Sequence, residues 1–234
     1  MGMNKKGGNT GDGAGIIFFN PINNAETSCM WARRVAEDTE GAKEREAKCG
    51  LVHELYYESL DGDIETVRIV DKGEFGEMLE ILMDDNGERY LLQMPFSSDI
   101  GKAFIMRLEN IDPVLPIEIG LWLKGKKRIL WAKQGDQKVA NPYAGVKGED
   151  GTITWAKELP KPIEKKKRGG KSDWDWTEQN DALFELCRDW AIKNDWVKNE
   201  EEFMTSPIKA ASDDTPAPEP APDAPPPEDD DVPF

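Results

Sequence analysis

The fold of this chain is decided by the stretch Met78-Leu-Glu-Ile-Leu-Met-Asp-Asp-Asn-Gly-Glu-Arg-Tyr-Leu-Leu-Gln-Met94. Two apolar runs flank the dipeptide Asn86-Gly87, which supplies the positive φ values that a tight hairpin turn requires. The pattern predicts two antiparallel strands, 78–83 and 89–94, joined by a short turn. We therefore expect the chain to be built around a β-hairpin.

Upstream of this hairpin, the sequence predicts further strands and one helix. Residues 16–19 and 64–70 have the composition of strands, and the aromatic-rich segment 53–60 precedes a turn predicted at Asp61-Gly62-Asp63. Residues 29–48 are charged and rich in good helix formers, so they predict a helix.

Downstream, Ser97 or Ser98 can cap a second helix. Its apolar positions follow helical spacing, at Ile100, Phe104, Leu108 and Ile111. A second hairpin over 117–123 and 128–131 follows, and 152–155 has the composition of an edge strand. A β-meander, a helix and a hairpin, in that order, are typical of the OB-fold. We therefore expect a mainly β protein with an OB-fold-like five-stranded Greek-key barrel, one helix between strands 3 and 4, extra helices and disordered termini.

Composition divides the chain into five segments. Residues 1–15 contain six glycines and form a predicted flexible arm. The predicted OB-like DNA-binding domain spans 16–160, and a basic linker spans 161–172. Residues 173–204 form an amphipathic helical element that we expect to pack on the barrel or on a second subunit. Residues 205–234 are rich in proline and acidic residues, and we expect a disordered tail.

The charge of the chain is negative and uneven. The net charge is −16, and the segment 205–234 carries −7 of it. The remaining residues still carry −9, which argues against binding to nucleic acid through the surface as a whole. A nucleic-acid-binding function would need a local basic groove.

The chain offers no cofactor, metal or membrane signal. Its cysteines, Cys29, Cys49 and Cys187, have no Cys-x-x-Cys spacing, and with the single histidine, His53, they make no zinc set. We expect no cofactor and no metal.

Sparse cysteines are typical of a reducing cytosol, so we expect a cytoplasmic protein of a bacterium or of a phage-infected host. No apolar run approaches the roughly 18–20 residues that span a bilayer, and we expect no membrane partner.

Catalytic motifs are also missing from the sequence. There is no Walker loop and no nucleophile elbow, and Ser/His or Cys/His catalysis would depend on His53 alone. Acidic pairs such as Asp84-Asp85 are typical of solvated turns in so acidic a chain. We expect a binding protein rather than an enzyme, with a metal-dependent nuclease as a remote alternative.

The strongest candidate site is a basic and aromatic patch. Between Leu121 and Ala144 there are six basic residues and one acidic residue. Aromatic rings can stack on bases while lysine and arginine meet phosphates. The candidate DNA-binding residues are Tyr57, Phe75, Trp122, Lys124, Lys126, Lys127, Arg128, Trp131, Lys133 and Tyr143. Neighbouring residues of a strand face opposite ways, so we expect Leu121 and Trp122 on opposite faces, and Leu130 on the face opposite to Trp131. The alternative is an ordinary exposed basic turn with at least one of the two tryptophans in the core.

A second candidate site is the end of the sequence, Asp229-Asp230-Asp231-Val232-Pro233-Phe234. The ring of Phe234 and the side chain of Val232 can fill an apolar pocket, while the α-carboxylate meets an arginine or lysine. The tip closely resembles that of bacterial and phage single-stranded DNA-binding proteins, which typically reads Asp-Asp-Asp-Ile-Pro-Phe. The resemblance implies recruitment of replication, recombination and repair proteins.

The resemblance covers only these six residues, so no binding residue outside the tip is transferred from the family. The body of the chain is longer and more acidic than the family's usual domain, which favours a divergent phage member. We expect a protein that binds single-stranded DNA without strong sequence preference, with the oligomeric state left open, including a homo-oligomer. One alternative is an acidic protein that mimics DNA or the tail and occupies a basic groove on a replication or defence enzyme. A third is an accessory factor that binds DNA only through its partners.

Overall fold

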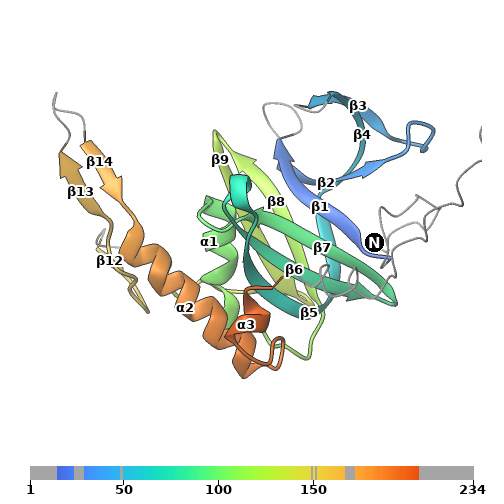
Figure 1. The fold of residues 1–234 in the computed structure, drawn as a ribbon. Helices are drawn as coiled ribbons and strands as arrows, with labels where there is room; N and C mark the ends of the chain where they lie inside the picture. Colours follow the sequence, from blue (N-terminus) through green and yellow to red (C-terminus); the bar gives the residue numbers. More distant parts are fainter. Residues whose placement is uncertain are drawn as a thin grey trace, which may run out of the picture.

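The computed structural model describes residues 15–23, 29–47, 50–148, 150, 152–166 and 172–205 (Figure 1). The protein is mainly β, as predicted. The expected flexible arm, except Gly15, and the expected acidic tail, except Thr205, lie outside the described residues. Among the described helices, none has both the length and the apolar character that a membrane crossing requires.

A ten-stranded mixed sheet dominates the fold, in the order β10-β9-β8-β5-β6-β7-β1-β2-β4-β3. Its strands are β1 (Ile17–Asn23), β2 (Cys29–Val35), β3 (Lys43–Ala47), β4 (Gly50–Tyr57), β5 (Ser59–Asp71), β6 (Glu77–Asp85), β7 (Glu88–Pro95), β8 (Ile117–Lys124), β9 (Lys127–Gln134) and β10 (Gln137–Lys138). Two further antiparallel pairs are β11 (Val146–Lys147) with β12 (Ile153–Thr154), and β13 (Ile163–Lys166) with β14 (Ser172–Asp175). The helices are α1 (Asp99–Ile105), α2 (Thr177–Lys193) and α3 (Glu200–Phe203), with 3-10 turns η1 (Gly73–Phe75) and η2 (Leu108–Asn110).

The predicted central hairpin is confirmed as β6 and β7. Asp85 pairs with Glu88 across the turn, and Asn86 and Gly87 have φ values of 54° and 87°. Both lie in the left-handed region that this turn type needs. The Asp84 carboxylate accepts a hydrogen bond from the Gly87 amide at 2.8 Å, which closes the turn.

The turn predicted at residues 61–63 is wrong, because these residues lie inside β5. Gly62 serves close packing instead of a turn: a Cβ atom there would lie 2.6 Å from the carbonyl oxygen of Asp84. β5 pairs with β8 through residues 59–62 and with β6 through residues 63–71, so one long strand joins two parts of the sheet.

The helix predicted over residues 29–48 is also wrong, because this segment supplies β2 and β3. Cys29 and Trp31 point into the core with the two-residue period of a strand. Trp31 is fully buried, and its indole Nε1 donates a hydrogen bond to the carbonyl oxygen of Ile119 in β8 at 3.1 Å. Burial of this side chain against a distant strand outweighs the helix propensity of its neighbours.

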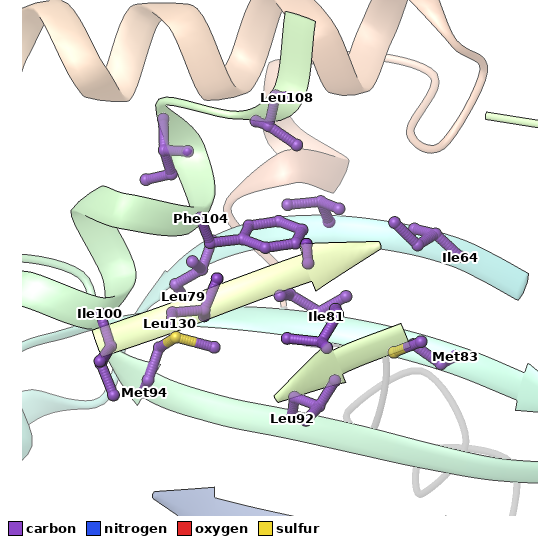
Figure 2. Close-up of a cluster of buried hydrophobic side chains, with 14 of the residues drawn as sticks. Ile64, Leu79, Ile81, Met83, Leu92, Met94, Ile100, Phe104, Leu108 and Leu130 are labelled. Atoms are coloured by element: carbon purple, nitrogen blue, oxygen red, sulfur yellow. The ribbon is translucent and has the colours of Figure 1, made fainter. Parts of the chain in front are cut away.

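One hydrophobic core joins the helices to the sheet. Figure 2 shows Ile100 and Phe104 of α1 directed toward Leu79 and Leu130 of the strands below, and all four are buried. The hydroxyl of Ser98 accepts a hydrogen bond from the Gly101 amide at 3.2 Å, which confirms the predicted cap.

The C-terminal helix α2 packs on this same core. Leu183, Cys187 and Ala191 are fully buried in it, so the described part of the predicted helical element packs on the sheet of its own chain. β13, which was predicted to be linker, pairs with β14 at the N-terminal end of α2, away from the large sheet (Figure 1). The predicted edge strand at 152–155 contains β12, which pairs with β11 rather than with the large sheet.

The strand order around α1 follows the expected order in part. β5, β6 and β7 form a meander, α1 follows, and β8 and β9 form a hairpin. Over the residues that the structure describes, the sheet has ten strands, whereas the prediction was a five-stranded barrel. Within the described residues, β9 pairs with β8 and β10, and the second edge of β7 pairs with β1 in parallel.

Arg68 in β5 fixes the end of the described chain. Its buried guanidinium donates hydrogen bonds to the carbonyl oxygens of Glu202 and Thr205, at 2.9 and 2.7 Å, and to the Glu202 carboxylate at 3.1 Å. The carbonyl groups at the C-terminal end of a helix have no hydrogen-bond donor within the helix. Arg68 supplies donors to the carbonyl groups at the end of α3.

Replacement of Arg68 by methionine is expected to lower the free energy of unfolding by about 2–4 kcal/mol, because several charge-assisted hydrogen bonds disappear from a buried site. Urea unfolding measures this loss, and hydrogen exchange should accelerate in residues 200–205. Arg89→Met is the control, since Arg89 pairs with Glu65 at the surface and such pairs contribute at most about 1 kcal/mol. Equal losses in the two variants would contradict the role given to Arg68.

Candidate nucleic-acid interface

The β8–β9 hairpin carries the predicted tryptophans on its outer face. Leu121 and Leu130 point into the core, whereas Trp122 is 48% exposed and Trp131 is partly exposed. The expected alternation of faces is confirmed, but the expectation that one tryptophan belongs to the core is wrong. In the ladder Trp122 lies opposite Ile129 and Gly120 lies opposite Trp131, so the two tryptophans are diagonal neighbours.

Trp131 lies across the backbone of β8, and Gly120 makes this possible. A Cβ atom at Gly120 would lie 2.1 Å from Cζ2 of the Trp131 ring. The ammonium of Lys133 lies 4.7 Å from the ring centroid of Trp131 and 3.7 Å from the Glu118 carboxylate. The Trp131 ring is therefore held against the strand with a cation over it. An aromatic ring and a lysine are the groups that meet a base and a phosphate in single-strand binding.

The basic residues of the hairpin divide between its two faces. Lys124, Lys126 and Lys127 are exposed around the turn at Gly125. Arg128 lies opposite Leu123 in the ladder, on the face away from Trp131. Three of the predicted lysines thus surround the tip of the hairpin, while Arg128 faces the other way.

Arg128 lies near Cys29, and its positive charge affects the pKa of the Cys29 thiol. Burial raises the pKa of the Cys29 thiol above its ordinary value, and the positive charge of Arg128 opposes that rise. Arg128 is therefore better placed to act on the inner side of the hairpin than on a strand of DNA lying across Trp131.

A hollow of about 360 Å³ adjoins the two tryptophans, and we call it the tryptophan hollow. It lies where β8 extends past its pairing with β5 and faces the start of β2. Its lining comprises Cys29, Met30, Glu58, Leu121, Trp122, Leu123 and Trp131. Ligand pockets commonly have volumes of roughly 300–1,000 Å³, so the hollow has room for one base beside the exposed rings.

The remaining predicted aromatic residues do not join this face. Phe75 is 80% exposed in η1, but η1 follows the far end of β5, roughly 30 Å along the strand from the β8 pairing. The hydroxyl of Tyr143 donates a hydrogen bond to Glu109 at 3.3 Å, in a surface cluster with Lys157. Burial, with help from Glu109, raises the pKa of Tyr143.

Tyr57 is partly buried and belongs to the interior of the sheet. Its ring makes an edge contact with Phe19, with centroids 5.2 Å apart, and the Arg33 guanidinium lies 5.7 Å from the ring centroid. Burial raises the pKa of the Tyr57 hydroxyl. The structure therefore brings Trp122, Trp131 and the lysines together and leaves Tyr57 as a packing residue.

A second, larger cavity was missed by sequence reasoning. It has a volume of about 560 Å³ and lies over β1, β2, β3 and β4. We call it the arginine cleft, because its lining includes Arg33, Arg34 and Arg45 together with Glu54. All three arginines fall in the segment 29–48 that was predicted to be a helix. A helix would not have placed Arg45 on a strand next to β4, as β3 does. Residues 29–35 show no alternation of apolar and polar side chains, because Cys29-Met-Trp-Ala32 is continuously apolar and two arginines follow it, so the sequence offered no periodic signal for this face.

Glu54 organises one wall of the arginine cleft. Its buried carboxylate accepts hydrogen bonds from Nε and Nη2 of Arg45, at 2.8 and 2.6 Å, and a third from the Tyr56 hydroxyl at 3.1 Å. The hydrogen bonds from Arg45 hold the pKa of Glu54 below its ordinary value, and nearby Arg34 adds to that effect. Glu54 is therefore a fixed anion that positions Arg45.

Gly120→Ala is expected to displace the Trp131 ring and to weaken binding of oligo-dT by roughly tenfold, because stacking on one aromatic contributes about 1–3 kcal/mol. Gly145→Ala is the matched control: its Cβ would meet Trp155 Nε1 at 2.9 Å, on the separate β11–β12 pair. Fluorescence anisotropy of labelled oligo-dT measures both affinities. Unchanged affinity in Gly120→Ala, with a shifted tryptophan emission spectrum, would contradict the role given to Trp131.

No protein-family model, curated protein or solved structure matches this chain. The geometry of the described residues and the sequence of the tip are therefore the features that indicate the function of this protein.

Proposed function

We propose that this protein binds single-stranded DNA without strong sequence preference and takes part in replication, recombination and repair. The observation that carries the proposal is the outer face of β8 and β9. There, Trp122 and Trp131 lie beside a hollow that can hold a base, and lysines surround the turn. Stacking needs no particular base, because every base has a π-face.

The proposed core is an OB-fold-like barrel within the larger sheet. The order β5, β6, β7, α1, β8, β9 and the sharing of β5 between β6 and β8 support this architecture. OB-folds commonly bind oligonucleotides across their strands and loops. The function is binding rather than catalysis, in the cytosol of a bacterium or of a phage-infected host.

The acidic tip completes the proposal as the part that recruits other proteins. Residues 229–234 combine carboxylates with Val232, Pro233 and Phe234. Proline lowers the entropic cost of ordering the peptide, because its φ angle is already fixed. The tip would dock replication, recombination or repair proteins of the host, as the resemblance to bacterial and phage tips implies.

The proposed function is tested by anisotropy titrations of labelled oligo-dT and of a duplex of equal length, at rising salt. We expect the single strand to bind much more tightly than the duplex. Affinity should fall with salt, with a logarithmic slope near −0.7 for each phosphate contacted. If the protein bound neither DNA, the proposal would be overturned. The alternative of an acidic protein that mimics DNA or the tail would then be favoured, and the net charge of −16 is consistent with it.

A further inference from the structure

The β13–β14 hairpin carries two exposed tryptophans next to the N-terminal end of α2. Trp174 in β14 is 51% exposed, and Trp176, which directly precedes α2, is 44% exposed. Only one residue separates the two, so their Cα atoms lie at most about 7 Å apart. Neither ring belongs to the buried core of the described residues. Two large exposed rings this close together form a surface, which is unlike the scattered single apolar residues of an ordinary protein exterior.

A lysine accompanies each of these two rings. The ammonium of Lys102 in α1 lies 4.7 Å from the ring centroid of Trp176. In the β13–β14 ladder, exposed Lys166 is a diagonal neighbour of Trp174, so both side chains point to the same face of the hairpin. The surface therefore repeats the combination of an aromatic ring and a lysine that is found at Trp131.

The sequence of this region is basic within an acidic chain. Residues 161–176 contain six basic and three acidic residues, whereas the whole chain has a net charge of −16. One of the three acids, Asp175, is engaged: its carboxylate forms an ion pair with Lys165 at 2.5 Å and accepts hydrogen bonds from the amide and the hydroxyl of Thr177. A segment with a positive net charge and exposed aromatic rings suits the phosphates and the bases of a single strand.

Contacts with the helices hold the hairpin in place and join it to the β8–β9 hairpin. The Gln179 side chain in α2 donates a hydrogen bond to the carbonyl oxygen of Pro160, just before β13, at 3.0 Å. Helix α1, which supplies Lys102, packs against both α2 and β9. Figure 1 shows the β13–β14 hairpin beyond the N-terminal end of α2, away from the large sheet. The two tryptophan surfaces are therefore separate but connected through α1.

We propose that the β13–β14 hairpin is a second contact surface for single-stranded DNA, with bases against Trp174 and Trp176 and phosphates at Lys102 and Lys166. This inference rests on the proposed function, because it extends the bound strand from the β8–β9 hairpin to a surface beyond α1. One OB-fold covers about 4–16 nucleotides. A strand within that length occupies the β8–β9 face alone, and a longer strand reaches the β13–β14 hairpin as well.

The first test measures the affinity of Trp174→Ala for oligo-dT of about 8 and of about 40 nucleotides, which lie within and beyond the site of one OB-fold. The variant should bind the long strand roughly tenfold more weakly than the wild type, because one stacking platform is lost, and should bind the short strand as the wild type does. Trp155→Ala is the matched control, since Trp155 is 47% exposed and lies outside the hairpin.

The outcomes separate this inference from the proposed function. Equal affinities of Trp174→Ala and Trp155→Ala for the long strand would overturn the second surface, while binding of the short strand would leave the proposed function intact. Failure of the wild type to bind either strand would overturn the proposed function itself. Sedimentation velocity tests the other occupant, a second copy of this chain: a wild-type dimer that Trp174→Ala dissociates would also overturn the second surface.

The second test compares Lys102→Met with Lys193→Met, which remove the same kind of cation from opposite ends of α2. The ammonium of Lys193 lies 4.3 Å from the ring centroid of Trp190, about 24 Å along the helix from its first residue. For the long strand, Lys102→Met should lower the magnitude of the salt slope by about 0.7, because one phosphate contact is lost, and Lys193→Met should leave the slope unchanged. Equal slopes in the two variants would overturn the phosphate contact at Lys102.

Discussion

The double replacement of Trp122 and Trp131 by alanine is expected to weaken binding of oligo-dT by about 100-fold or more. Each exposed ring offers a platform for one base, and alanine substitution at such platforms costs about 1–3 kcal/mol per base. Neither ring forms part of the buried core, so the folded structure should persist. The fluorescence anisotropy of labelled oligo-dT measures the loss, and far-ultraviolet circular dichroism checks the fold.

Trp155→Ala is the control for this pair. Trp155 is 47% exposed, against 48% for Trp122, but it follows β12 in a separate two-stranded sheet. The control variant should retain most of its affinity. If Trp155→Ala weakened binding as much as the double variant, the outer face of β8 and β9 would not be the stacking surface.

Removal of residues 229–234 is expected to abolish capture by a host protein that recognises the Asp-Asp-Asp-Ile-Pro-Phe tip of bacterial single-stranded DNA-binding proteins. The affinity of the truncated protein for oligo-dT should stay the same or rise, because the truncation removes negative charge that competes with phosphates. Surface plasmon resonance with the immobilised host protein measures the first effect, and the anisotropy assay measures the second.

Two synthetic peptides of residues 229–234 sharpen this experiment. The peptide with a free carboxylate should compete for the host protein, and the peptide with a C-terminal amide should compete at least tenfold less well, because a charge-assisted hydrogen bond is lost. A truncated protein that lost its affinity for oligo-dT, or two peptides that competed equally, would contradict the separation of DNA binding from recruitment.

Local signals in the sequence predicted the parts of the fold that local chemistry controls. Asn86-Gly87 specified its hairpin because both residues tolerate positive φ, and Ser98 specified the start of α1 because its hydroxyl satisfies an amide. The alternation of Leu121 and Trp122 correctly predicted that they lie on opposite faces. These features required no knowledge of distant residues.

Distant contacts explain where the predictions failed. Residues 29–48 have helical composition, but Trp31 packs against β8 across the sheet, and that contact favours a strand. Gly62 resembled a turn residue because glycine is common in turns. Its actual role is close approach to β6, which depends on a strand some twenty residues later in the chain.

The arginine cleft could not be predicted for the same reason. Phe18, Arg34 and Arg45 come from three strands, and only the pairing of β1 with β2 and of β4 with β2 and β3 brings them together. The tryptophan face was predictable because both tryptophans belong to one local hairpin. Sites built within a hairpin can be inferred from sequence, whereas sites built across a sheet need the strand order.

The most direct test of the central claim is intrinsic tryptophan fluorescence during titration with unlabelled oligo-dT, in the wild type and in a Trp122→Phe, Trp131→Phe variant. Trp31 is fully buried and Trp196 is nearly so, so these two should contribute a constant signal. We expect strong quenching in the wild type, weakened by salt, and a loss of most of that quenching in the variant, whose phenylalanines still stack on bases. Equal quenching in both proteins, or none in either, would contradict the claim that bases stack on Trp122 and Trp131.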